Sequence, residues 1–197
     1  MNVAISESED RKFAALRAWF DPDPYYEDNY LRHLHKCSKI DDTCSWAFQD
    51  SNDVGRLLLH WQGTDKDYSL VQVTGDPGQG KSVLAAQIIE RYEVPLYFFC
   101  PDAGMAKTTP EKLLRTLAYC LAIKDPVVRA KYLSLKETTL PLENVSFNLL
   151  WEKLFKAILN QDLSRTFHCV IDGFDQIPDH KALISHFLGL REFRTNM

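Results

Sequence analysis

Two stretches of this sequence hold residue types that could do chemistry, and the first is GDPGQGKS, residues 75–82. Its glycines, lysine and serine fit the pattern G-x-x-x-x-G-K-[ST], which is typical of phosphate-binding loops. Glycines let backbone N–H groups turn toward phosphate oxygens, and the start of a following helix adds the positive end of its dipole. We therefore expect this loop to bind a nucleoside di- or triphosphate.

Two side chains of this stretch have separate expected roles. Lys81 should reach the β- and γ-phosphates, and the Ser82 hydroxyl should coordinate a Mg²⁺ ion that bridges the same phosphates. The predicted nucleotide-binding residues are the loop and the first turn of the helix after it: Gly75, Asp76, Pro77, Gly78, Gln79, Gly80, Lys81, Ser82 and Val83.

The second stretch is VIDGFDQ, residues 170–176. A phosphate-binding loop needs an acidic partner at the end of a neighbouring strand to hold the metal, and Asp172 ends an apolar run. We predict Asp172 as a metal ligand with Ser82. Asp175 is the candidate catalytic residue, because a carboxylate there could orient or activate an attacking water. The alternative for Asp172 is an ordinary acidic turn after a strand.

These residues need a strand, loop and helix to position them. The pattern predicts a strand over 69–74, a helix over 81–92 with Val83, Ala86, Ile88 and Ile89 inward, and further strands over 94–100 and 167–172. Further helices are expected from Pro110, from Asp125-Pro126, over 147–159 and over 179–190. Alternating strands and helices indicate a parallel sheet.

The chain before the loop reads differently. An N-terminal helix should end before Asp21-Pro22, and residues 25–68 read as a linker with a weak helical pattern before Gly63. We therefore expect an N-terminal helix and linker over 1–66 and a core domain over 67–197.

Composition excludes some classes of function. The formal net charge is −4, without the basic excess that nucleic-acid binding exploits. The N-terminus lacks a signal-peptide pattern, and no apolar run is long enough to span a bilayer. Five cysteines at irregular spacings favour reduced thiols. We expect a cytoplasmic protein with neither nucleic-acid nor membrane partners.

The stretches GDPGQGKS and VIDGFDQ together resemble the NACHT class of STAND ATPases, which have a small residue after the metal aspartate and an acid two positions further on. Upstream, FDPDPYYEDN and DDTCSWAF resemble the segment before the loop in fungal NACHT proteins with a nephrocystin 3-like N-terminal domain. The resemblance covers about residues 13–190. It implies that Trp46 lies near the nucleotide base.

This resemblance implies a signalling switch that binds ATP or ADP with Mg²⁺, with ATP favoured over GTP and GTP/GDP left open. Family members commonly carry an acid where this chain has Gln176, so hydrolysis is expected to be slow or absent. The implied partners are other copies of the chain or a signalling domain.

The implied fold is a P-loop NTPase three-layer α/β sandwich whose parallel sheet is incomplete at the C-terminus. The chain ends at Met197, before the family's next strand and winged-helix region. We expect either a fragment of a larger protein or a reduced sheet in which strands 69–74 and 167–172 pair directly.

Two other functions stay open. A small kinase or phosphotransferase uses the same loop, with Arg191 and Arg194 as the arginines available for a lid. A non-catalytic interaction fragment is the other. The sequence leaves undecided the base, hydrolysis, the effector, the trigger and the oligomeric state.

Overall fold

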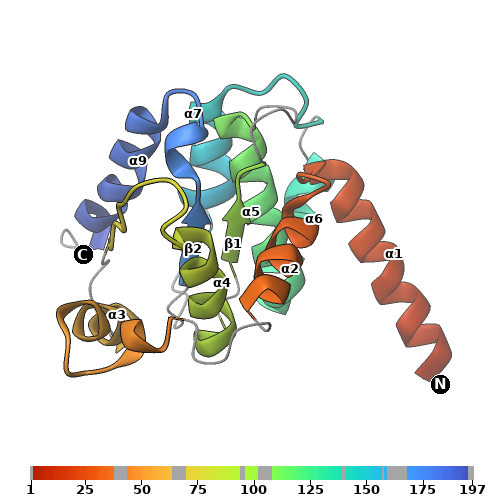
Figure 1. Ribbon diagram of the computed structural model, residues 1–197. Coiled ribbons are helices and arrows are strands. Elements are labelled where there is room, and N and C mark those ends of the chain that lie inside the picture. The colour runs from red at the N-terminus through yellow and green to blue at the C-terminus, as the bar shows by residue number, and fades with distance from the viewer. Residues whose placement is uncertain are drawn as a thin grey trace. The chain divides into compact units, whose positions relative to one another are not determined.

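The computed structural model describes residues 2–37, 44–63, 70–93, 96–101, 108–138, 141–156, 158 and 168–194. The described structure is mostly helical, with a small parallel sheet of two strands (Figure 1). An α/β class is compatible with it. The chain forms two compact units: unit 1 is Met1–Pro24 with Thr108–Ser164, and unit 2 is Tyr25–Lys107 with Arg165–Met197. Among the described residues, no helix is both long and apolar enough to cross a lipid bilayer.

The regular elements described in unit 1 are all helical. Its elements are α1 (Asn2–Phe20), α5 (Pro110–Lys124), α6 (Pro126–Thr138), α7 (Phe147–Leu150) and the π-helical turn η2 (Trp151–Lys156). The predicted helix starts are confirmed, because the Thr109 side chain caps α5 and the Asp125 carboxylate accepts from two N–H groups of the first turn of α6. The helix predicted over 147–159 begins as expected but changes to π-helical geometry at Trp151.

Aromatic side chains fill the centre of unit 1. The Phe20 ring, at the end of α1, lies edge-on to Tyr132 with ring centroids 5.0 Å apart, and it also contacts Tyr119. Tyr132 is fully buried, and its hydroxyl donates to the backbone carbonyl of Leu154 in η2 at 2.5 Å. Burial strongly raises the pKa of Tyr132, because a charged phenolate would lose its hydration there.

Unit 2 contains the sheet. Its elements are α2 (Tyr26–Cys37), η1 (Ser45–Phe48), α3 (Asp53–Gly63), α4 (Lys81–Tyr92), β1 (Leu96–Phe99), β2 (Cys169–Asp172), η3 (Phe174–Gln176) and α9 (His180–Arg194). The strands run parallel, as predicted, with Leu96 opposite Cys169 and Phe99 opposite Asp172. Residues 94–95 and 167, parts of the predicted strands, lie outside the described residues.

Both faces of β1 are buried. Tyr97 and Phe99 point to the face that α2 covers, where the Tyr30 ring lies 4.7 Å from that of Tyr97. Leu96 and Phe98 point to the opposite face and are also buried. A strand buried on both faces is typical of parallel sheets, which explains the continuous apolar run in the sequence.

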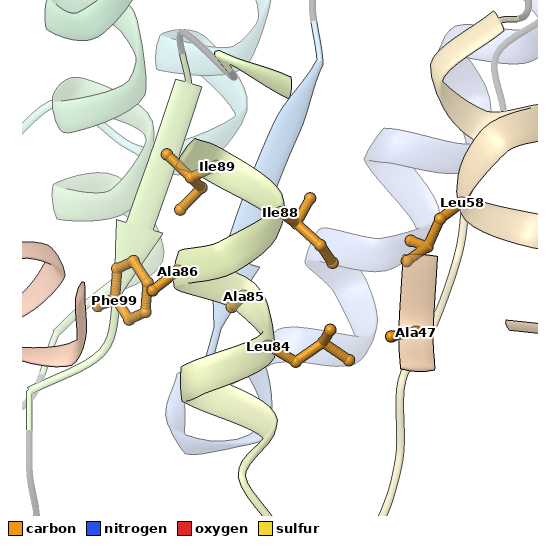
Figure 2. Packing of buried hydrophobic residues seen from close by; sticks show 8 residues of the cluster. All are labelled: Ala47, Leu58, Leu84, Ala85, Ala86, Ile88, Ile89 and Phe99. Atoms are coloured by element: carbon orange, nitrogen blue, oxygen red, sulfur yellow. The ribbon is translucent and has the colours of Figure 1, made fainter. Parts of the chain in front are cut away.

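The inner face of α4 packs into an apolar cluster with η1, α3 and β1 (Figure 2). The expected inward side chains Ala86, Ile88 and Ile89 are buried, and Val83 is partly buried. The other buried members of the cluster are Ala47, Leu58, Leu84, Ala85 and Phe99. This packing fixes α4, and with it the start of the helix, against the sheet.

The prediction of a strand over 69–74 is wrong for the residues that the structure describes, 70–74, which form neither strand nor helix. Figure 1 draws this segment, in yellow, as a loop ahead of α4. A strand needs a neighbour to receive its backbone hydrogen bonds, and in the described sheet β2 pairs with β1 instead. Without a neighbour, Leu70 and Val73 stay 62% and 46% exposed. The direct pairing of strands 69–74 and 167–172 is therefore also not seen.

The region expected as a linker, 25–68, is largely helical where it is described. The weak pattern before Gly63 is α3, as predicted, but α2 was not expected. The contact face of α2 is made of Tyr26, Tyr30 and His33, whose rings meet Tyr97 and Phe99 of β1. These residues recur at helical spacing and the segment is clearly amphipathic, so the signal for this helix was present in the sequence and was missed.

Candidate functional site

The loop of residues 75–82, called the glycine loop below, leads directly into α4 in unit 2. Gly78 and Gly80 both have φ of +83°, in the left-handed region that side chains rarely adopt. A Cβ atom at either position would meet nothing within 4 Å, so backbone conformation rather than lack of space requires glycine there. The space beside both glycines is therefore open to a ligand.

The first turn of α4 carries no side-chain cap. Gly80 stands at the N-cap position and has no side chain that could accept from the first N–H groups of the helix. Its backbone carbonyl accepts the first helical bond, from Leu84 N at 2.9 Å. Among the described residues, the backbone N–H groups of Lys81 and Ser82 at the start of the helix have no hydrogen-bond acceptor and can serve a ligand. Together with the helix dipole they favour negative charge at this point.

Lys81 turns back over the glycine loop. Its ammonium Nζ donates to the backbone carbonyls of Gly75 at 2.7 Å and Asp76 at 2.8 Å. An ammonium group has three N–H donors, and among the described residues these two carbonyls are its hydrogen-bond partners. The third N–H donor of the Lys81 ammonium group therefore has no hydrogen-bond partner among the described residues.

A second contact crosses the same loop from Gln79 to Asp76. The Asp76 backbone N–H donates to Gln79 Oε1 at 2.9 Å, and Gln79 Nε2 donates to the Asp76 carboxylate at 3.4 Å. We call this pair of bonds the Gln79–Asp76 bridge. The sequence pattern counted Gln79 only as a backbone member of the loop, and the role of its side chain was missed. The three-residue spacing between Asp76 and Gln79, which suits bonds across a turn, is the signal that was available.

Asp172 lies at the end of the sheet where α4 begins. It is the last residue of β2 and stands opposite Phe99 in the register, and its backbone carbonyl accepts from Cys100 N at 3.0 Å. Figure 2 shows Phe99 beside Ala86, in the N-terminal half of α4. The carboxylate is partly buried. The structure therefore places the predicted metal aspartate and the start of α4 at one end of unit 2.

The chain turns sharply after Asp172. Gly173 has φ of +70°, and a Cβ there would lie 2.9 Å from the Cβ of Cys100, so glycine is required by both conformation and space. The turn leads into η3, where Asp175 is exposed. Among the described residues, no side-chain contact joins Asp175 to the glycine loop. The structure brings Asp172 to the site but leaves the role of Asp175 a prediction.

The sequence matches the family described as Nephrocystin 3, N-terminal, over residues 42–196. This range is more than three quarters of the chain and contains the glycine loop, α4 and both strands. The chain belongs to the nephrocystin 3 N-terminal family. The expected resemblance to a nephrocystin 3-like domain is thereby confirmed at the level of the family.

Beyond the nephrocystin 3 N-terminal match, no curated protein is significantly similar to this chain. No solved structure matches it either. The chemistry of this nephrocystin 3 N-terminal domain must therefore be argued from its own residues: an uncapped helix start, an ammonium group held over a loop, a hydroxyl at Ser82 and a carboxylate at Asp172. Donors and a cation of this kind bind anions, and the two oxygen ligands suit a hard divalent cation.

Proposed function

We propose that this chain is a nucleotide-binding module of the NACHT type within the STAND class of P-loop NTPases. It binds ATP or ADP, or their guanine counterparts, through the glycine loop. The observation that carries the proposal is the uncapped start of α4 with the Lys81 ammonium held over the loop before it. The three-layer sandwich, the fungal origin and the cytoplasmic location belong to the same proposal.

The phosphate groups would meet two kinds of donor. Backbone N–H groups of the loop and of the uncapped start of α4 would donate to phosphate oxygens in the open space beside Gly78 and Gly80. Lys81 adds a positive charge whose position two carbonyl acceptors already restrain. Because these groups are held before a ligand arrives, binding loses less conformational entropy than it would in a mobile loop.

Magnesium fits the remaining groups. Mg²⁺ prefers oxygen ligands and usually keeps several waters, so one or two protein ligands suffice beside phosphate oxygens. Ser82, in the first turn of α4, and Asp172, at the end of β2, supply a hydroxyl and a carboxylate from the same end of unit 2. When bound, the ion would neutralise phosphate charge.

We propose that hydrolysis of the bound nucleotide is slow. Asp175, exposed in η3, is the candidate for orienting or activating a water. General-base catalysis typically contributes about 10² to 10⁴-fold in rate. Asp175→Asn should therefore lower phosphate release by a factor of that order and leave nucleotide affinity unchanged. In the proposed switch, the bound nucleotide controls association with further copies or with a signalling partner.

A thermal melt with and without MgATP, MgADP, MgGTP and MgGDP tests the proposal. A ligand at about one hundred times its dissociation constant stabilises by about 2.7 kcal/mol, or roughly 5 to 10 °C in a chain of this size. Lys81→Ala should abolish the shift, because the positive charge over the loop is gone. Lys181→Ala, at an exposed position of α9, is the matched control and should keep it.

The variant Asp172→Asn tests the proposed magnesium ligand. Wild type should bind nucleotide more tightly with Mg²⁺ than with a chelator present, whereas Asp172→Asn should bind equally in both conditions. Asp50→Asn, at an exposed position in unit 2, should behave as wild type. If no nucleotide shifts the melt of wild type, the proposal is wrong. Phosphate found on an added nucleoside rather than in solution would indicate a kinase instead.

A further inference from the structure

We propose that Gln79 is a positioning residue of the glycine loop, holding it in the shape that receives phosphate. This inference rests on the proposed function and concerns the same site. Its basis is the Gln79–Asp76 bridge, in which one side chain accepts from the Asp76 backbone N–H and donates to the Asp76 carboxylate. A third bond, from Gln79 N to Asp76 O at 3.3 Å, closes the turn between them.

The bridge spans the bend of the loop without filling the space that a ligand needs. Gln79 Oε1 lies on the side of Gly75, where a Cβ atom would approach it to 2.4 Å. On the other hand, hypothetical Cβ atoms at Gly78 and Gly80 meet nothing within 4 Å. The amide of Gln79 therefore leaves the open side of these two glycines clear, which distinguishes a positioning residue from a competitor for the phosphate.

The Gln79–Asp76 bridge also restrains a backbone carbonyl to which Lys81 donates. Lys81 Nζ donates to the carbonyls of Gly75 and Asp76, the two residues against which the Gln79 side chain lies. Holding Asp76 in place therefore holds one of the two acceptors that fix the ammonium over the loop. Loss of the bridge should widen the range of loop shapes, of which a smaller fraction binds phosphate.

This arrangement gives Gly75 a specific reason to lack a side chain. Its φ is not in the left-handed region, so conformation alone does not demand glycine there. A Cβ there would displace the flexible end of the Gln79 side chain, which costs little in packing but would break the bridge. Gly75 and Gln79 should consequently be coupled in their effect on binding.

The test compares the full chain with Gln79→Met, a side chain of similar length without hydrogen-bonding groups. Gln72→Met, at an exposed position just before the loop, is the matched control. Calorimetric titration with MgADP should show about three- to tenfold weaker binding for Gln79→Met, the range expected for one or two lost hydrogen bonds at an exposed site. Without nucleotide, the Asp76 amide should exchange faster in Gln79→Met and stay unchanged in Gln72→Met.

A double-mutant cycle provides the second measurement. Gly75→Ala should weaken MgADP binding in wild type and have a smaller effect in the Gln79→Met background, because the bridge is already absent there. Equal affinity of Gln79→Met and wild type would overturn the role of Gln79 and leave the proposed function standing. Absence of MgADP binding by wild type would overturn both, and the amide exchange would still report whether the bridge forms.

Discussion

Glycines occur in this chain for different physical reasons, and Gly80 and Gly189 contrast most clearly. Neither position has an atom within 4 Å of a hypothetical Cβ, so an added methyl group would meet no obstacle at either. Gly80 has φ of +83°, whereas Gly189 lies within α9. The same substitution should therefore have opposite effects on the free energy of unfolding.

Gly80→Ala should destabilise the chain by about 1 to 2 kcal/mol, the cost of a left-handed conformation for a residue with a Cβ. Gly189→Ala should stabilise it by about 0.5 to 1 kcal/mol, because glycine is unfavourable inside a helix. Urea unfolding without nucleotide measures both. If Gly80→Ala were neutral or stabilising, the conformation described for the glycine loop would be wrong.

At the scale of elements, one buried hydroxyl joins α6 to the π-helical turn η2 by a hydrogen bond. Tyr132 OH donates to the carbonyl of Leu154, a group inside a turn whose hydrogen-bond spacing is irregular. Tyr132 therefore supplies a hydrogen bond to this turn from another helix.

Tyr132→Phe should lower the free energy of unfolding by about 1 to 3 kcal/mol, because the Leu154 carbonyl is left buried without its donor. Tyr92→Phe is the control, since the described residues give the Tyr92 hydroxyl no hydrogen bond. Burial raises the Tyr132 pKa above its unfolded value of about 10. The stability from this hydroxyl is therefore complete below pH 10 and is lost as the pH rises further, so wild type and Tyr132→Phe should converge in alkaline unfolding measurements.

The elements that the sequence predicted are those with strong local signals. Pro110 and Pro126 mark helix starts, and α4 is confirmed from Lys81 to Tyr92 with its inward residues. The failed strand prediction depended on a distant neighbour, because residues 70–74 have the composition of a strand but no described partner. The helix α2 is instead amphipathic, so its signal was present in the sequence and was missed. The same limit applies to the site, where the motif indicated Lys81 and Asp172 but not the Gln79–Asp76 bridge.

At the scale of the whole molecule, each compact unit is assembled from two separate stretches of chain. Helix periodicity describes an element and its own face, so it carries no information about which distant element covers that face. The division into unit 1 and unit 2 could therefore not be read from the sequence. One consequence is that substitutions in different units should separate effects on stability from effects on the proposed nucleotide binding.

Phe20→Ala tests this separation. Phe20 is fully buried in unit 1, and its loss should cost about 3 to 5 kcal/mol of stability. Because the glycine loop and its described contacts belong to unit 2, the MgADP dissociation constant measured below the melting range should stay within about twofold of wild type. Ile89→Ala, which removes a buried contact of α4, should lower both stability and affinity. Equal loss of affinity in the two variants would show that the units are energetically coupled.

Because unit 1 is built from two separate stretches of chain, it cannot fold until the second stretch has been synthesised. The stretch that ends at Pro24 must wait for Thr108 and the residues after it, with about 80 residues translated in between. At roughly 5 to 20 residues per second, the delay is about 4 to 16 seconds. During that time Leu16 and Phe20, which are fully buried in the finished protein, have no partner helix to cover them. The first helix is thus the segment of a ribosome-bound nascent chain where a chaperone is most expected to bind.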